Sequence, residues 1–331
     1  MDLMRLCPSK VVSAEEAVSK IKNGSRVFIG TGCGEPQSLI EAMVNDSSIQ
    51  DVLVYQMLSS TFSRYIDDES FRRKFSLKLF FISASMRKAA FDGKIDYIPA
   101  YLSQIPRLFA SHRIGLDVAL VQVSPPDKFG YCSLGVSVDI TRSAVEHAAM
   151  VIAQVNSMMP RTPGHSFIHL DDVSVIVEQE EELLSAFDLP AYESASDIAG
   201  ITANLIDDGA TIQLGLAELS QPIAKALAQK IDLGIHTEIL TDDLMELVSQ
   251  GVVTNRYKTL NEGKVIASGA IGSQELYRSL HNNVIIEFRP SDYVNNPAII
   301  AQNNKMVAIN FARTMDLSGQ VYADALPHNH F

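Results

Sequence analysis

Cysteine is scarce in this sequence. Its 331 residues include three cysteines, Cys7, Cys33 and Cys132, and no two of them form a C-x-x-C pair. An odd number of widely spaced cysteines argues against a disulfide framework and against a structural zinc site. We therefore expect a protein of a reducing compartment, the cytoplasm.

Long apolar runs are also absent. No stretch approaches the roughly 20 apolar residues that a membrane-spanning helix needs. The N-terminal segment has neither an apolar run after its basic residue nor a small-residue cleavage pattern, so no signal or transit peptide is expected. The hydrophobic fraction of 47% and the charged fraction of 20% are ordinary for a globular protein. They exclude disordered, collagen-like and coiled-coil chains.

Basic residues are outnumbered by acidic ones. The 27 Lys and Arg residues stand against 39 Asp and Glu residues, which gives a net charge of -12. Such a charge repels nucleic acid and anionic membranes at long range, so neither is an expected partner. An anionic ligand would have to be held locally, for example by backbone N–H groups at a helix N-terminus.

Several catalytic motifs are missing. The sequence contains no G-x-S-x-G, no H-E-x-x-H and no G-x-x-x-x-G-K-[ST], and its histidines show no partner pattern with serine or cysteine. We therefore expect neither serine-hydrolase chemistry, nor a metal site, nor a permanently bound cofactor. Cys33 is interpreted as a small buried apolar residue.

Short β-rich runs alternate with segments of helical periodicity along the whole chain. The pattern is typical of an α/β fold with a mostly parallel sheet that is covered on both faces. An acidic, loop-like stretch after Glu178 contains Pro190 and predicts a boundary between an N-terminal domain, residues 1–190, and a C-terminal domain, residues 191–331. Strands are expected at 26–30, 51–56, 78–82, 117–123, 150–155, 173–177, 210–214, 233–237, 264–268, 284–288 and 306–309.

The two halves resemble each other. Residues 14–43 align with residues 199–228 at a constant offset of 185, which places Gly24 on Gly209 and Gly30 on Gly215. Each copy has the order helix, Asn/Asp-Gly turn, strand, glycine-containing loop, helix. We therefore predict two similar open-sheet domains that face each other across a cleft, a usual place for a ligand.

Two segments could carry chemistry. The loop from Gly30 to Pro36 has a glycine at every second position up to Gly34, which lets backbone approach a bulky ligand and equally fits a tight strand–helix turn. Glu238 lies at the carboxyl end of a predicted strand. Open α/β sheets bind ligands just outside the carboxyl ends of their strands. A helix beginning near Asp242 would help to keep Glu238 ionised. From position alone, a carboxylate at the end of a strand is more often solvated or capping than catalytic.

Seven segments together resemble the acetyl-CoA hydrolase/transferase family, the family I CoA-transferases that include 4-hydroxybutyrate CoA-transferase. The resemblance extends over nearly the whole chain, in order and in register. It implies an enzyme that moves CoA from a short-chain acyl-CoA to a short-chain carboxylate. The segments are GEP (34–36), DYIPAYLSQIPRLF (96–109), VSPPDKFGYCSLGVSVD (123–139), VNSMMPRTPGHSFIH (155–169), LGIHTE (233–238), GVVTNRYKTLNEGK (251–264) and DYVNNPAIIAQNNKMVAIN (292–310).

The resemblance also implies a mechanism. The nucleophilic glutamate of the family falls on Glu238, whose carboxylate would attack the thioester to give an anhydride and then a glutamyl-CoA thioester, in a ping-pong cycle. Two alternatives remain: an acyl-CoA hydrolase, in which water replaces the acceptor, and a catalytically silent CoA-binding module. The residues implied in CoA or substrate binding are Gln213, Gly215, Ala217, Asn296, Gly34, Glu35 and Pro36.

The sequence departs from the family pattern in two ways. Ala217 stands where the family usually has glycine, and Ser220 stands where it often has proline. Both departures fall at or beside the segment that the resemblance implies in CoA binding. The chain stops at Phe331, where family members continue into a glycine-rich loop and an Asp-Phe-Ile-Arg-Gly-like segment. We therefore expect a C-terminally truncated second domain of low activity, and its ALPHNHF ending resembles members with a further acetyltransferase-like domain. The family also leads us to expect a homodimer.

Overall fold

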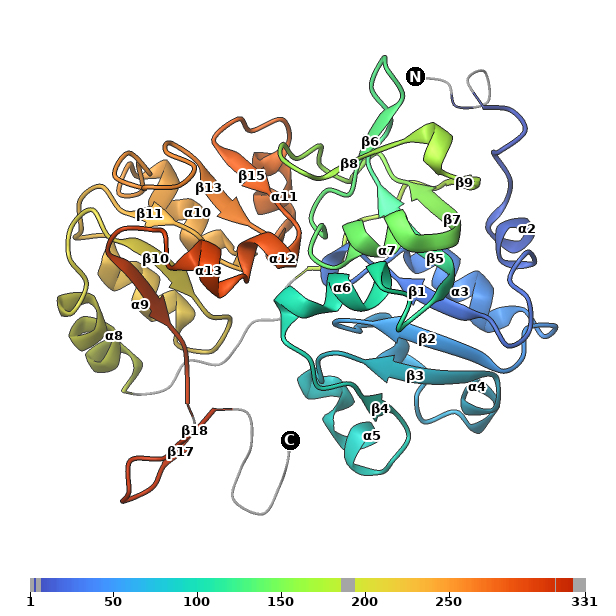
Figure 1. Cartoon of the computed structure of the whole chain (residues 1–331), viewed down its shortest axis with the longest axis horizontal. Coiled ribbons are helices and arrows are strands. Elements are labelled where there is room, and N and C mark those ends of the chain that lie inside the picture. The colour runs from blue at the N-terminus through green and yellow to red at the C-terminus, as the bar shows by residue number, and fades with distance from the viewer. Residues whose placement is uncertain (1–2, 4–6, 186–193, 313, 324–331) are drawn as a thin grey trace.

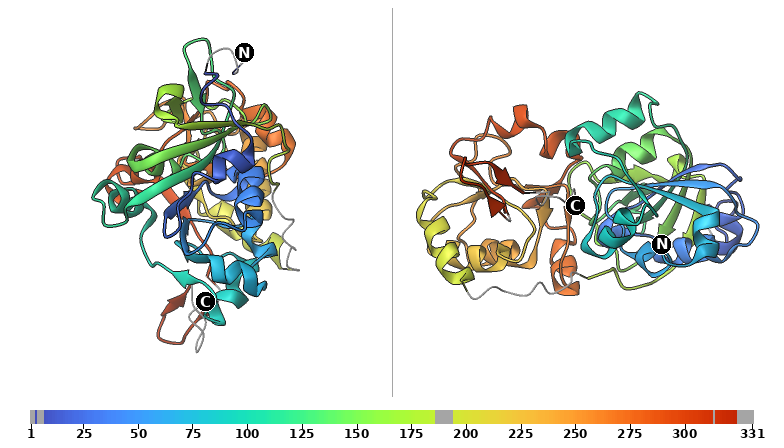
Figure 2. Two further views of the ribbon diagram at one scale, coloured as in Figure 1. Left: turned by 90° about the vertical axis from the view of Figure 1, so that its right-hand side faces the viewer. Right: turned by 90° about the horizontal axis from the view of Figure 1, so that it is seen from below.

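The computed structural model describes residues 3, 7–185, 194–312 and 314–323, and it has two lobes that lie side by side (Figures 1 and 2). The expected domain boundary at residue 190 and the ALPHNHF ending lie outside these residues. Among the described residues, no helix has the length and the apolar character needed to cross a membrane.

The N-terminal lobe, residues 7–185, is built on a parallel sheet of seven strands in the order β4-β3-β2-β1-β5-β7-β9. A hydrophobic core lies on each face of this sheet. In β1, Phe28 packs into the core on one face, and Val27 and Ile29 pack into the core on the other. The sheet is therefore covered on both faces, as predicted. Its strands are β1 (Arg26–Ile29), β2 (Val52–Gln56), β3 (Phe75–Leu79), β4 (Asp96–Tyr97), β5 (Leu116–Val123), β7 (Ala148–Val155) and β9 (Val175–Glu178).

Helices and one small ribbon complete this lobe. The antiparallel ribbon consists of β6 (Tyr131–Ser133) and β8 (Phe167–His169). The helices are α2 (Ala14–Val18), α3 (Gln37–Asn45), α4 (Glu69–Lys74), α5 (Arg87–Phe91), α6 (Ile105–Ala110) and α7 (Thr141–His147).

The C-terminal lobe, residues 194–323, also has a parallel sheet. A bridge between His236 and Ile266 joins β11 to β13, which gives the strand order β15-β13-β11-β10-β16. The strands are β10 (Thr211–Leu214), β11 (Gly234–Ile235), β12 (Ile239–Leu240), β13 (Val265–Ala267), β14 (Gly269–Ala270), β15 (Ile286–Phe288), β16 (Met306–Ile309) and the hairpin β17 (Thr314–Met315) with β18 (Val321–Tyr322). The helices are α8 (Ala195–Asn204), α9 (Ser220–Leu227), α10 (Asp242–Ser249), α11 (Gln274–Leu280), α12 (Ser291–Val294) and α13 (Pro297–Ile300).

The two lobes share their topology. The order β15-β13-β11-β10-β16 matches β4-β3-β2-β1-β5 strand for strand along the chain. The aligned glycines even make equivalent hydrogen bonds: the N–H of Gly30 donates to the carbonyl of Leu120 (2.8 Å), and that of Gly215 donates to the carbonyl of Ile309 (2.9 Å). The prediction of two similar open-sheet halves is confirmed.

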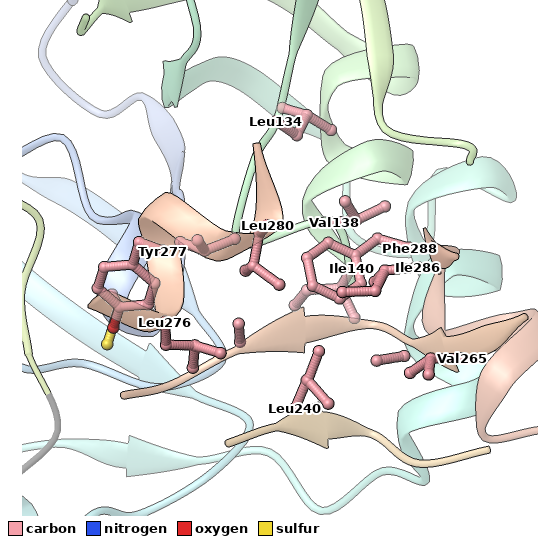
Figure 3. Close-up of a cluster of buried hydrophobic side chains, with 14 of the residues drawn as sticks. Leu134, Val138, Ile140, Leu240, Val265, Leu276, Tyr277, Leu280, Ile286 and Phe288 are labelled. Atoms are coloured by element: carbon pink, nitrogen blue, oxygen red, sulfur yellow. The ribbon is translucent and has the colours of Figure 1, made fainter. Parts of the chain in front are cut away.

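The lobes are joined by backbone contacts and by a shared core. The carbonyl of Val136 accepts the N–H of Ala270 (2.9 Å), and the carbonyl of Ser268 accepts the N–H groups of Val138 (3.1 Å) and Asp139 (3.0 Å). Residues 136–139 of the first lobe thus lie directly against residues 268–270 of the second. Figure 3 shows the apolar side chains at this junction, Leu134, Val138 and Ile140 from the N-terminal lobe with Leu240, Val265, Leu276, Tyr277, Leu280, Ile286 and Phe288 from the C-terminal lobe.

Gly34 allows the loop after β1 to approach this junction. A Cβ atom at Gly34 would lie only 2.5 Å from the Cβ of Ser137. We expect Gly34→Ala to lower the free energy of unfolding by about 1–3 kcal/mol, because the extra carbon must displace packed atoms. Denaturant unfolding would measure this loss.

The matched control is the double variant Gly34→Ala with Ser137→Gly. Removing the opposing Cβ should recover part of the loss, which a double-mutant cycle reports as a coupling energy. A cycle with no coupling would refute the steric explanation.

Candidate active site

Glu238 lies at a break between two short strands. β11 ends at Ile235 and β12 begins at Ile239, while in the neighbouring chain segment β13 ends at Ala267 and β14 begins at Gly269. The two breaks are held together, since the carbonyl of Glu238 accepts the N–H groups of Ser268 (2.8 Å) and Gly269 (3.2 Å). The backbone at Glu238 is therefore fixed while its side chain leaves the sheet.

The carboxyl group of Glu238 is largely withdrawn from water. Burial raises its pKa above the usual range, and the negative charge of Asp139 acts in the same direction, whereas a hydrogen bond from Asn295 lowers that pKa. This hydrogen bond joins Asn295 Nδ2 to Glu238 Oε2 over 3.1 Å. The helix expected near Asp242 is present as α10 (Asp242–Ser249), while the net shift of the Glu238 pKa is upward and its largest cause is burial. Once ionised, a desolvated carboxylate of raised pKa is a stronger nucleophile than one in water.

Asp139 brings a second carboxylate from the N-terminal lobe. It is 4% exposed and accepts hydrogen bonds from the Thr31 hydroxyl, the Thr141 N–H (2.9 Å) and the Thr141 hydroxyl (2.9 Å). Its own carbonyl accepts the N–H of Ser291 (3.0 Å). Asp139 was not among the expected site residues, although an acid at the end of the otherwise apolar and small segment 134–139 was an available signal.

The structure separates the roles of two adjacent asparagines. Asn296 Oδ1 accepts the N–H of Ala298 (2.9 Å), so Asn296 is the N-cap of α13, and Pro297 follows at the first helical position. Asn295 is the residue that contacts Glu238. His236 supports it, because the imidazole Nε2 is 2.8 Å from the carbonyl of Val294. The geometry therefore favours Asn295 over Asn296 beside the reacting group.

Three of the residues that the resemblance implies in CoA or substrate binding, Gln213, Gly215 and Ala217, lie where β10 ends. The side chains of Gln213 and Asn310 exchange two hydrogen bonds (3.2 and 3.1 Å). Ser220 Oγ donates to the carbonyl of Gly215 (2.7 Å) and accepts the N–H of Ala217 (2.8 Å). Ala217 is not among the residues with positive φ, so alanine fits without backbone strain. This region adjoins the reacting group, since Thr237 Oγ1 donates to the carbonyl of Leu214 (3.3 Å).

Gly34, Glu35 and Pro36 form part of the N-terminal lobe's own framework. The buried carboxylate of Glu35 accepts the N–H groups of Ser60 (2.6 Å) and Thr61 (2.8 Å), and burial raises its pKa to about 7. Glu35 therefore ties the loop after β1 to the loop after β2, and Pro36 precedes α3. Gly34 lies near the junction of the lobes, because it packs against Ser137. Ser137 is two residues before Asp139 in the chain.

Cys33 is buried, and burial raises its pKa to about 11, as expected for an unreactive apolar cysteine. Within the described part of the chain, no three His, Cys, Asp or Glu side chains come together in a way that could hold a metal ion. A surface hollow of about 440 Å³ between α2 and α3 is lined by neither Glu238 nor its partners.

Comparisons with known proteins agree with this geometry. Residues 5–187 match the acetyl-CoA hydrolase/transferase N-terminal domain, and residues 272–331 match the C-terminal domain of the same family. A 4-hydroxybutyrate coenzyme A transferase of Clostridium kluyveri is 41% identical over 98% of this chain and 76% of its own length. A succinyl-CoA:acetate/propanoyl-CoA:succinate CoA transferase of Fasciola hepatica is 36% identical over 96% of this chain and 67% of its own length.

Solved structures give the same result. RipA of Yersinia pestis superimposes with a TM-score of 0.92 at 35% identity, over 98% of this chain and 78% of its own. A 4-hydroxybutyrate CoA-transferase of Porphyromonas gingivalis superimposes with a TM-score of 0.81 at 35% identity, over 97% of this chain and 77% of its own. The chain therefore belongs to the acetyl-CoA hydrolase/transferase family of enzymes.

Proposed function

We propose that this protein transfers CoA from a short-chain acyl-CoA to a short-chain carboxylate through a covalent thioester on Glu238. The observation that carries the proposal is the desolvated Glu238 carboxylate at the junction of the lobes, with the Asn295 amide on one of its oxygens. The relatives named as CoA transferases support the same reaction class.

The first half of the reaction converts the thioester into an anhydride. A carboxylate oxygen of Glu238 attacks the thioester carbonyl carbon, the carbon–sulfur bond breaks, and CoA leaves as the thiolate. The thiolate then attacks the carboxyl carbon of Glu238 and expels the acyl group as a free carboxylate. Glu238 now carries CoA as a thioester, which conserves the free energy of the original bond.

The second half runs the same steps in reverse with the acceptor carboxylate. Gln213, Gly215 and Ala217 are proposed to contact CoA, because the end of β10 adjoins Thr237. The N–H of Ala217 would then exchange its hydrogen bond to Ser220 for one to CoA. On the opposite side, Gly34 lies at the N-terminal face of the junction, where the acyl group would sit.

Intact-mass spectrometry tests the proposal. The protein is incubated with acetyl-CoA or butyryl-CoA without an acceptor, and a CoA adduct that borohydride reduces is expected on the wild type. Glu238→Gln should form no adduct. Glu246→Gln is the matched control, because Glu246 is an exposed glutamate of the same lobe, and it should form the adduct normally.

An adduct on Glu238→Gln, or none on a wild type that binds CoA, would contradict the covalent mechanism. Release of CoA at a steady rate without acceptor would instead identify a hydrolase. Binding of CoA with neither adduct nor turnover would identify a silent CoA-binding module.

A further inference from the structure

Two polar contacts tie the strand break at Glu238 to the end of α12. Asn295 Nδ2 donates to Glu238 Oε2 (3.1 Å), and His236 Nε2 lies 2.8 Å from the carbonyl oxygen of Val294. His236 and Glu238 are two residues apart, and Val294 and Asn295 are neighbours in the chain. The two contacts therefore form a closed set around the reacting carboxyl group.

The His236 imidazole is the donor in the second contact. His236 is 1% exposed, and burial lowers its pKa, as do the positive charges of Lys258 and Arg289. The imidazole is therefore neutral at neutral pH and carries one N–H. Its Nδ1 atom has no hydrogen-bond partner in the described part of the chain, whereas its Nε2 atom lies beside a carbonyl oxygen, which can only accept. The N–H therefore belongs on Nε2.

The peptide group between Val294 and Asn295 is held at both of its polar ends. Its carbonyl accepts the His236 N–H, and its own N–H donates to the carbonyl of Ser291 (2.9 Å). α12 has only four residues, and carbonyl groups in the last turn of a helix have no partner within the helix. Because a peptide group is planar, fixing both ends also fixes the Cα atom of Asn295, whose amide reaches Glu238.

We infer that His236 is a positioning residue for the covalent step, because its Nε2–H fixes the peptide group that aims the Asn295 amide at Glu238. The inference rests on the proposed covalent function. His236 acts through Val294 and Asn295 rather than on the substrate. Without the His236 N–H, the Val294 carbonyl has no donor and the peptide group is free to rotate. The nucleophile then loses both its fixed orientation and the hydrogen bond from Asn295.

The surrounding charges determine the direction of the expected pH effect. The Asn295 hydrogen bond lowers the pKa of Glu238, and the charge of Asp139 raises it. Loss of the Asn295 hydrogen bond therefore raises the pKa of Glu238 and moves the acid limb of the kcat/KM profile to higher pH. Replacing a neutral imidazole by a phenyl group changes no charge. A shift of the acid limb in such a variant of His236 must therefore come through Asn295.

His236→Phe tests the inference, because it keeps an aromatic ring beside Tyr293 and removes the N–H. Its kcat and its rate of adduct formation in a single turnover should fall by about 10–10²-fold, the scale of a misplaced reacting group. KM for acyl-CoA should change little, and the acid limb should move to higher pH. His236→Gln has an amide N–H that reaches the Nε2 position and should restore most of the rate. His236→Asn is one bond too short and should behave like His236→Phe.

A double variant shows whether His236 acts through Asn295. In the Asn295→Ala background, the added change His236→Phe should slow the reaction no further, because the group that His236 positions is already gone. The matched control is His147→Phe in the N-terminal lobe. His147 Nδ1 also lies beside a backbone carbonyl, that of Ser143 (2.8 Å). This control should leave both kcat and the acid limb unchanged.

Three results would overturn the inference and leave the proposed function standing. The first is adduct formation by His236→Phe at the wild-type rate. The second is a lower melting temperature with the acid limb in place, which would show a purely structural role. The third is a double variant whose loss equals the sum of the two single losses in free energy. A wild type that forms no adduct would refute the proposed function first, and the inference with it.

Discussion

Glu238→Gln is expected to lower kcat by roughly 10⁴-fold or more, the scale of loss seen when a covalent nucleophile is removed. Glutamine has nearly the shape of glutamate, and its carbonyl oxygen can still accept the Asn295 amide. It has no negative charge with which to attack a thioester. Steady-state turnover with an acyl-CoA and an acceptor acid measures the effect.

The stability of this variant separates chemistry from folding. Burial raises the pKa of Glu238, so the ionised carboxylate is destabilised in the folded protein. Glutamine removes that cost, and the melting temperature should stay the same or rise at neutral pH. A variant that kept more than about 1% of wild-type turnover would contradict the assignment of Glu238 as nucleophile.

Asn295→Ala is expected to lower kcat by about 10²-fold, because it removes a charge-assisted donor from the reacting carboxyl group. It should also change the pH profile. The Asn295 hydrogen bond lowers the pKa of Glu238, so its loss raises that pKa further. Since the reaction needs ionised Glu238, the acid limb of the kcat/KM profile should move to higher pH, and the deficit should be largest at low pH.

Two variants control for this shift. Asp139→Asn removes the charge that raises the pKa of Glu238, so its acid limb should move to lower pH. Asn296→Ala removes the N-cap of α13 and should cost about 1 kcal/mol of stability with no shift of the limb. If the acid limb of the kcat/KM profile shifted for Asn296→Ala and not for Asn295→Ala, Asn296 would be the asparagine that acts on Glu238.

The expected strands agree with the observed ones where a strand is long and buried on both faces. β5 and β7 have nearly continuous apolar sequences. Such a run marks a strand that is buried on both faces, so its place in the sequence can be predicted without an alternating pattern. β3 was expected at 78–82, where the apolar run is densest, but it lies at Phe75–Leu79. Its alternating residues Phe75, Leu77 and Leu79 are the buried ones. β4, β6 and β8 were not expected, because two or three residues carry no measurable period.

The sequence by itself determined the α/β class, the two similar halves and the position of Glu238 at the end of a strand, since local apolar patterns and a recognisable family pattern carry that information. Tertiary structure alone decided that Asn295 rather than Asn296 contacts Glu238, and that Glu35 supports a loop within its own lobe. It also brought Asp139, about a hundred residues away in sequence, close enough for its charge to raise the pKa of the reacting carboxylate. The reason is physical: the pKa and the hydrogen bonds of a buried group depend on which groups surround it, and at this site the surrounding groups come from both lobes.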